Sequence, residues 1–204
     1  MTSTTPPSPS LIIAIDGPSG AGKGTVARAV AAALEYRHVD TGAMYRAVAW
    51  KAVHDRVDLQ DEDAVAALAE SARIDVSDGA VTVNGHDVRE AIRTPEIDAA
   101  AAAVARQSRV RQVLIVQQRE MGAGGGVVKE GRDIGTVVFP RADVKIYLDA
   151  APDERARRRA NDPAHAQPAA VAEVATALTE RDRLDRTRAA SPLYAAPDAV
   201  VVDT

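Results

Sequence analysis

A glycine-rich stretch near the start of the chain constrains the fold more than any other feature. Residues 17–25 read GPSGAGKGT, directly after the apolar run LIIAID and directly before an Ala-rich segment typical of a helix. The spacing is that of a P-loop, in which glycine N–H groups converge on phosphate at a helix N-terminus and a lysine reaches the outer oxygens. Gly24 stands where the magnesium-binding hydroxyl is expected, and Thr25 follows one place later. The stretch predicts a strand, a phosphate-binding loop and a helix.

Short apolar runs alternate with longer helical patterns along the rest of the chain. The further candidate strands are RHVD, GVVKEG, VKIYLDA and DAVVVD. This alternation predicts an α/β domain with an about five-stranded, mostly parallel sheet flanked by helices, because strands buried on both faces are apolar throughout. Asp78-Gly79 and Asn84-Gly85 are hairpin-turn dipeptides between alternating residues, so a small antiparallel insertion is expected around them. The Ala-rich run DAAAAAVARQ, residues 98–107, is expected to form a plain helix.

Composition excludes several classes of function. The 204 residues carry a formal net charge of −4, which argues against broad binding to nucleic acid or to an anionic membrane. The chain has no cysteine, which excludes a disulfide framework and a thiol nucleophile and fits a reducing cytoplasm. Residues 1–10 have neither the basic start nor the apolar length of a signal peptide. We therefore expect a disordered tail over 1–10 and one cytoplasmic domain over 11–204.

Two further motifs follow predicted strands. DTGAMYR spans residues 40–46, and EGRDIGTVVFP spans residues 130–140, at the sheet edge where α/β proteins bind ligands. Each has a plainer interpretation. Asp40 or Thr41 could simply cap the next helix, and Arg132 with Asp133 could form a salt bridge within a turn.

Arginines gather in the last third of the chain. ERARRRA offers Arg155, Arg158 and Arg159, although a solvated helix face accounts for at least one of them. In RDRLDRTR, Arg181, Asp185 and Arg188 fall on one helical face, where they form either a ligand site or an exposed ion-pair ladder. Asp162-Pro163 and Pro168 interrupt the two helical patterns between these motifs, which is typical of a mobile lid.

In this order, GPSGAGKGT, DTGAMYR and GRDIGTVVFP resemble the motifs of bacterial cytidylate kinases, which are P-loop nucleoside monophosphate (NMP) kinases. The resemblance runs from about Leu11 to the last residue. It implies transfer of the γ-phosphoryl group of ATP to CMP or dCMP, giving ADP and CDP or dCDP. It also implies an NMP-binding insertion at about 42–115 and a lid at about 153–175. Mg²⁺ is expected to be carried mainly by ATP phosphates and water, without a side-chain metal site.

Matching the family motifs assigns roles to single residues. By resemblance, Arg46 and Arg132 hold the acceptor phosphate, Arg111 reads the base, and Arg188 lies near the transferred phosphate. Asp185 would bind the acceptor ribose, with Arg181 beside it. The candidate ATP-binding residues are Gly17, Pro18, Ser19, Gly20, Ala21, Gly22, Lys23, Gly24, Thr25, Arg155 and Arg159. The candidate acceptor-binding residues are Ser19, Thr41, Tyr45, Arg46, Arg111, Arg132, Asp133, Arg181, Asp185 and Arg188. The candidate catalytic residues are Lys23, Arg132, Arg158 and Arg188.

The chemistry of the two substrates agrees with these roles. The acceptor is a phosphate oxygen already largely ionised near neutral pH, with a second pKa of about 6, so positioning and charge neutralisation replace a strong general base. Asp133 can accept a hydrogen bond from the cytosine N4 amine while Arg111 donates to the ring. Uracil reverses the donors and acceptors at ring positions 3 and 4, so it would not fit the same pair. Because catalysis would rest on charge neutralisation, we expect arginines around the two facing phosphates.

Some features depart from the family or leave alternatives open. Ala102 lies where a serine usually helps to hold the base, and the chain stops at VVVDT without the usual C-terminal helix, which leaves one side of the terminal strand uncovered. The four histidines show no ligand spacing and are interpreted as surface or structural residues. A kinase for another small acceptor and a nucleotide-binding switch without catalysis are the alternatives, although no Asn-Lys-x-Asp guanine motif supports a GTPase. We expect a monomer with CMP and dCMP as its partners.

Overall fold

The fold is built around one parallel sheet. The computed structural model describes residues 10–76, 79–161 and 171–204. Five strands pair in the order β2-β6-β1-β7-β8, and every pair is parallel. The strands are β1 (Ile12–Asp16), β2 (Arg37–Asp40), β6 (Val127–Gly131), β7 (Val144–Asp149) and β8 (Val200–Asp203). The predicted five-stranded α/β fold is confirmed.

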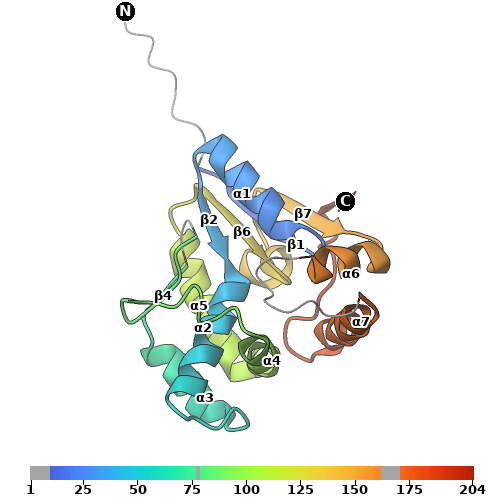
Figure 1. Ribbon diagram of the computed structural model, residues 1–204. Coiled ribbons are helices and arrows are strands. Elements are labelled where there is room, and N and C mark those ends of the chain that lie inside the picture. Colours follow the sequence, from blue (N-terminus) through green and yellow to red (C-terminus); the bar gives the residue numbers. More distant parts are fainter. Residues whose placement is uncertain (1–9, 77–78, 162–170) are drawn as a thin grey trace, which may run out of the picture.

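Helices cover this sheet and extend beyond one end of it. They are α1 (Lys23–Leu34), α2 (Thr41–His54), α3 (Glu62–Ser71), α4 (Pro95–Val104), α5 (Ser108–Gly122), α6 (Pro152–Ala160) and α7 (Val171–Thr187). In Figure 1, α1 lies across the sheet, α2 to α5 gather at the lower left, and α6 and α7 lie together on the right. Among the described residues, no helix combines the length and apolar character that a membrane span requires.

The predicted antiparallel insertion is present. Strands β3 (Ile74–Asp75), β4 (Thr82–Val83) and β5 (His86–Asp87) form a small antiparallel sheet in that order. Asn84 and Gly85 have φ values of 52° and 82°, the positive values that a tight hairpin turn between β4 and β5 requires. Asp78 of the other predicted turn lies outside the described residues, as do Asp162-Pro163 and Pro168.

Two clusters of apolar side chains make up most of the core. One cluster joins the four helices α2, α3, α4 and α5 to the small sheet, with Met44, Ile92 and Leu114 fully buried. The other packs α1 on the main sheet through small residues such as Ala27 against Ile15. The region between β2 and β6 therefore has a substantial core of its own. By contrast, Val200 and Val201 of the edge strand β8 are exposed.

Asp133 is followed by a structure that the sequence did not predict. Residues Ile134–Val138 form η1, a short π-helical turn, for which the sequence analysis named no element. Its N–H groups are bonded by a residue from a distant strand, which no local sequence pattern indicates.

The core of the insertion provides a test of stability. Leu114→Ala should lower the free energy of unfolding by about 2–5 kcal/mol, because it removes a buried side chain and leaves a cavity. Val116→Ala, on the exposed side of the same helix α5, should change it by less than about 0.5 kcal/mol. Urea unfolding of both variants measures the difference. Equal losses would contradict this packing.

Candidate active site

A pocket of about 520 Å³ opens where the carboxyl ends of β1, β2 and β6 meet. Most of the candidate site residues line it, although they come from segments far apart in the sequence. From the loop and α1 these are Ser19, Gly20, Gly22, Lys23, Gly24 and Thr25. From α2 and α5 they are Thr41, Tyr45, Arg46 and Arg111. From the end of β6 and the last third of the chain they are Arg132, Asp133, Arg158, Arg159, Arg181, Asp185 and Arg188. Gly17, Pro18, Ala21 and Arg155 are not part of this lining.

The glycine-rich loop is shaped by backbone conformations that suit glycine. Gly17 has a φ of 148°, and a Cβ there would lie 2.0 Å from the carbonyl oxygen of Leu148. Lys23 begins α1, and its Nζ donates to the Pro18 carbonyl at 2.6 Å. Burial, with the nearby Arg132 guanidinium, lowers the pKa of Lys23 to about 7, although Glu130 and Asp16 oppose this shift. An incoming phosphate would favour the charged form.

Gly24 leaves room for a carboxylate from the neighbouring strand. A Cβ at Gly24 would lie 3.2 Å from Oε1 of Glu130, a buried residue of β6 that also lines the pocket. The same Oε1 lies 3.0 Å from Nε2 of His38 on β2. His38 is buried, so the surface interpretation is wrong for it and the structural one remains.

Neither partner of this pair was predicted from the sequence to lie in the site. Glu130 opens the motif EGRDIG and lies one residue before the end of β6, so its position at the sheet edge was a usable signal. Nothing in RHVD indicates that His38 meets a residue 92 positions later.

The motif DTGAMYR places a cap and an arginine together. Asp40 caps α2 by accepting from the Ala43 N–H at 3.0 Å, so the capping interpretation is correct for Asp40. Its other oxygen accepts from Nη2 of Arg46 at 3.0 Å. Thr41 donates through its hydroxyl to the Glu130 carbonyl at 2.7 Å, which ties α2 to the end of β6.

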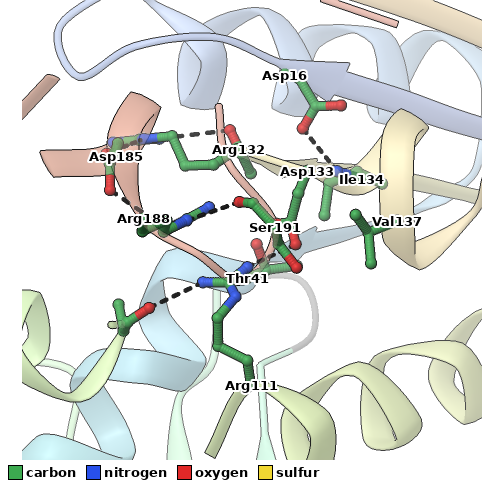
Figure 2. A network of polar contacts seen from close by, with 12 residues as sticks. Asp16, Thr41, Arg111, Arg132, Asp133, Ile134, Val137, Asp185, Arg188 and Ser191 are labelled. Carbon is green, nitrogen blue, oxygen red and sulfur yellow. Dashed lines mark hydrogen bonds and ion pairs between the residues drawn. The ribbon is translucent and has the colours of Figure 1, made fainter. Parts of the chain in front are cut away.

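A buried ion pair joins α5 to the loop after β6. Arg111 Nη2 and Asp133 Oδ2 are 2.5 Å apart, and both side chains are almost fully buried. Arg111 also donates to the Ala105 carbonyl at 3.1 Å, and its guanidinium lies 5.2 Å from the centre of the Tyr45 ring. Figure 2 shows this arginine rising from α5 towards the end of β6. Such a pair can meet a ligand that carries both donors and acceptors.

Asp185 lies between two arginines on the other side of the pocket (Figure 2). Its carboxylate accepts from Arg132 Nε at 3.1 Å and from Arg188 Nη1 at 3.3 Å. Although burial opposes the shift, Arg132, Arg188 and Arg181 together lower the pKa of Asp185. Burial, with Arg132 nearby, lowers the pKa of Arg181 to about 10. Arg188 lies just after the last residue of α7, and its side chain is buried. Arg181, Asp185 and Arg188 therefore do not form an exposed ion-pair ladder along the helix.

Several buried arginine donors lack a partner. Within the described part of the chain, Arg46 Nε, Arg111 Nε and Arg188 Nη2 are buried without a hydrogen bond. Buried donors are usually satisfied, so unpaired ones that border a pocket indicate a place for an acceptor from a ligand.

The arginines of α6 divide into different environments. Arg158 contacts Glu154 and the Thr204 hydroxyl, whereas Arg159 bonds to Asp98 of α4 at 2.7 Å. Arg155 lies outside the lining and donates to the Ser19 carbonyl and to Asp182, which supports the glycine-rich loop. Arg157 pairs with Glu154 on the exposed face. Asp98 was a further residue that the sequence analysis did not single out.

The pocket concentrates positive charge on an acidic protein. Its described lining carries ten cationic side chains and five acidic ones, against a net charge of −4 for the whole chain. The cationic residues are Lys23, Arg28, Arg46, Arg93, Arg111, Arg132, Arg158, Arg159, Arg181 and Arg188. No group of three or more side chains suited to hold a metal gathers within the described residues. The pocket can therefore hold more than one phosphate group.

Comparisons with known proteins agree with this geometry. A family model described as cytidylate kinase matches residues 13–204. A cytidylate kinase of Solibacter usitatus (strain Ellin6076) is 48% identical over 200 residues, covering 95% of this chain and 85% of the relative. A second, from Pelotomaculum thermopropionicum, is 49% identical over 197 residues, covering 94% and 87%. A bifunctional pantoate ligase/cytidylate kinase of Synechococcus sp. (strain WH7803) is 49% identical, covering 95% of this chain but 41% of its own length. The chain therefore belongs to the cytidylate kinase family.

Proposed function

We propose that this protein transfers the γ-phosphoryl group of ATP to CMP or dCMP, giving ADP and CDP or dCDP. One observation carries the proposal. The phosphate-binding loop and the buried Arg111–Asp133 pair face a single pocket lined by arginines. One end of this pocket suits a triphosphate and the other suits a monophosphate attached to a base.

ATP would bind with its phosphates in the loop of residues 17–25 at the start of α1. Lys23 would leave the Pro18 carbonyl, to which its Nζ donates, and contact the outer phosphates. Its charge would then follow the transferred group, where positive charge lowers the barrier most in a site with little water. Arg158 and Arg159, on the helix α6 that begins the proposed lid, would approach the phosphates of ATP when the lid closes.

The acceptor would bind on the side formed by α2, α5 and the loop after β6. Arg46 and Arg132 would hold its phosphate, and Arg188 would stand between the two substrates, each offering planar donors to phosphate oxygens. Asp185 would accept from the ribose hydroxyl, with Arg181 beside it. Asp133 would accept from the cytosine amine while Arg111 donates to the ring. Ser19, Thr41 and Tyr45 complete this proposed surface.

Mg²⁺ fits this pocket as a companion of ATP. The Glu130 carboxylate lies beside the glycine-rich loop, and Thr25 lines the same pocket; these oxygens suit the water shell of a hard cation. When bound, Mg²⁺ would neutralise charge on the phosphates. We propose that ATP phosphates and water supply most of its ligands.

The proposed organisation is one domain over residues 11–204. It has an NMP-binding insertion at about 42–115 and a lid at about 153–175. A separate apolar cluster supports the insertion as a unit. We further propose a monomer, because the lining of the pocket comes from one chain. We also propose a cytoplasmic location, and no nucleic-acid or membrane partners because the net charge is −4.

The function is tested by measuring ADP formation from ATP with CMP, dCMP, UMP and AMP as acceptors. We expect CMP and dCMP to be preferred. Preference for another acceptor would favour a different small-molecule kinase, and nucleotide binding without ADP formation would favour a switch.

Removing the charge of Lys23 should abolish most turnover. Lys23→Met keeps the length of the side chain but removes the cation, and kcat should fall about 10²–10³-fold. Lys51→Met, which removes a lysine of α2 outside the pocket, is the matched control and should retain activity. Near wild-type turnover in Lys23→Met would contradict the assignment.

ATP binding should take up a proton at alkaline pH. With its pKa lowered to about 7, Lys23 is mostly neutral at pH 8 in the free protein, and bound phosphate restores its charge. Affinity for ATP should therefore fall as pH rises from 6 to 8.5. Calorimetry at pH 8 in two buffers of different ionisation enthalpy measures the uptake. The same uptake in Lys23→Met would assign it to another group.

Asp133→Asn should reduce discrimination between the two pyrimidines. A carboxylate meets uracil O4 as acceptor against acceptor, at a cost of about 1–3 kcal/mol, whereas an amide can turn a donor towards it. The ratio of kcat/KM for CMP over UMP should fall, and Asp63→Asn, on the exposed face of α3, should leave it unchanged. If both activities fall together at a constant ratio, Asp133 does not read the base.

A further inference from the structure

A buried carboxylate outside the proposed catalytic and binding residues joins two parts of the pocket. Asp16 ends β1, directly before the glycine-rich loop, and is 5% exposed. Its Oδ1 accepts from the Ile134 N–H at 2.8 Å, and its Oδ2 accepts from the Gly135 N–H at 2.7 Å. Figure 2 shows this side chain reaching from β1 to the start of η1. Both oxygens thus bond residues more than 110 positions away in the sequence.

The two bonds from Asp16 take the place of a side-chain cap on η1 that the neighbouring residue Asp133 could otherwise supply. Asp133 stands directly before η1, where an aspartate usually accepts from the first free N–H groups of its own helix. Its side chain makes no such bond and pairs with Arg111 instead. Asp16 satisfies the N–H groups of η1, so the Asp133 carboxylate is not needed there.

We propose that Asp16 is a positioning residue for base recognition, because it caps η1 from β1 and leaves Asp133 to face Arg111 and the acceptor base. The inference rests on the proposed function. The capping role also explains why the Asp16 carboxylate is buried close to the Asp133 carboxylate. Without bonding partners, two buried negative charges so close together would be unfavourable. Both Asp16 oxygens are needed to bond two N–H groups, and Lys23 lies near enough to compensate part of the charge.

The electrostatic balance at Asp16 agrees with this role. Burial raises its pKa to about 6, while the N–H groups of Gly135 and Ile134 oppose the shift. The carboxyl group is therefore mainly ionised above neutral pH, with two oxygens able to accept. A neutral amide of the same size has one acceptor and would turn two donor hydrogens towards the second N–H group.

Asp16→Asn tests the proposal against a matched control. Asp143→Asn makes the same substitution at the other end of β1, where only one oxygen, Asp143 Oδ2, accepts from a backbone N–H, that of Ile12 at 2.8 Å. The amide oxygen of asparagine can keep this single bond. The ratio of kcat/KM for CMP over UMP should fall about tenfold in Asp16→Asn, since an unpaired buried group has a comparable cost. The ratio should stay unchanged in Asp143→Asn. An unchanged ratio in Asp16→Asn would overturn the proposal.

A double variant tests whether Asp16 acts through Asp133. In Asp133→Asn the ratio is already reduced, so adding Asp16→Asn should change it little further. Full additivity of the two effects would place the action of Asp16 elsewhere and overturn the proposal.

Hydrogen exchange separates this proposal from the proposed function. Without any nucleotide, the amides of Ile134 and Gly135 should exchange faster in Asp16→Asn than in the wild type or Asp143→Asn. Unchanged exchange would overturn the capping role. Absence of CMP phosphorylation in the wild type, with faster exchange in the variant, would reject the function and the base-reading role but keep the cap. If Asp16→Asn does not fold, Asp16→Ser, which retains a smaller acceptor, takes its place in both measurements.

Discussion

The site depends on the register of three parallel strands. Asp16 of β1 lies beside Gly131 of β6, and Asp40 of β2 lies beside Glu130. The glycine-rich loop, the start of α2 and the loop after β6 therefore leave the sheet at the same level. Parallel strands end at a common edge, so residues that are far apart in the sequence meet without any local signal. A shift of one residue in either pairing would turn every side chain of the shifted strand to the opposite face of the sheet.

The second constraint is the repulsion among arginines within one pocket. Asp185 lies between Arg132 and Arg188, and Asp133 pairs with Arg111, so carboxylates hold the guanidinium groups in place. Such pairs cost desolvation and contribute little to stability by themselves. Their value is positional, because they fix planar donors at the places where the proposed phosphates and base would lie.

The sequence indicated most of the pocket because its residues belong to compact motifs. The P-loop spacing and DTGAMYR each combine a strand end with a helix start, and GRDIG follows a strand end; short-range rules describe these features. The residues it missed act across the fold. His38 contacts Glu130, Asp16 caps η1, and Asp98 bonds to an arginine of α6; in each case the partner lies far away along the chain.

The sequence by itself determined the α/β class, the phosphate-binding loop and the supply of arginines on an acidic chain, because periodicity and glycine spacing are local properties. Only the tertiary structure decided which arginines face the pocket. It turned Arg155 towards Ser19 and Asp182, left Arg157 exposed, and brought Arg158 and Arg159 to the pocket, although all four belong to one helix. The physical reason is that a helix presents its side chains in every direction, and packing against the loop and α7 selects among them.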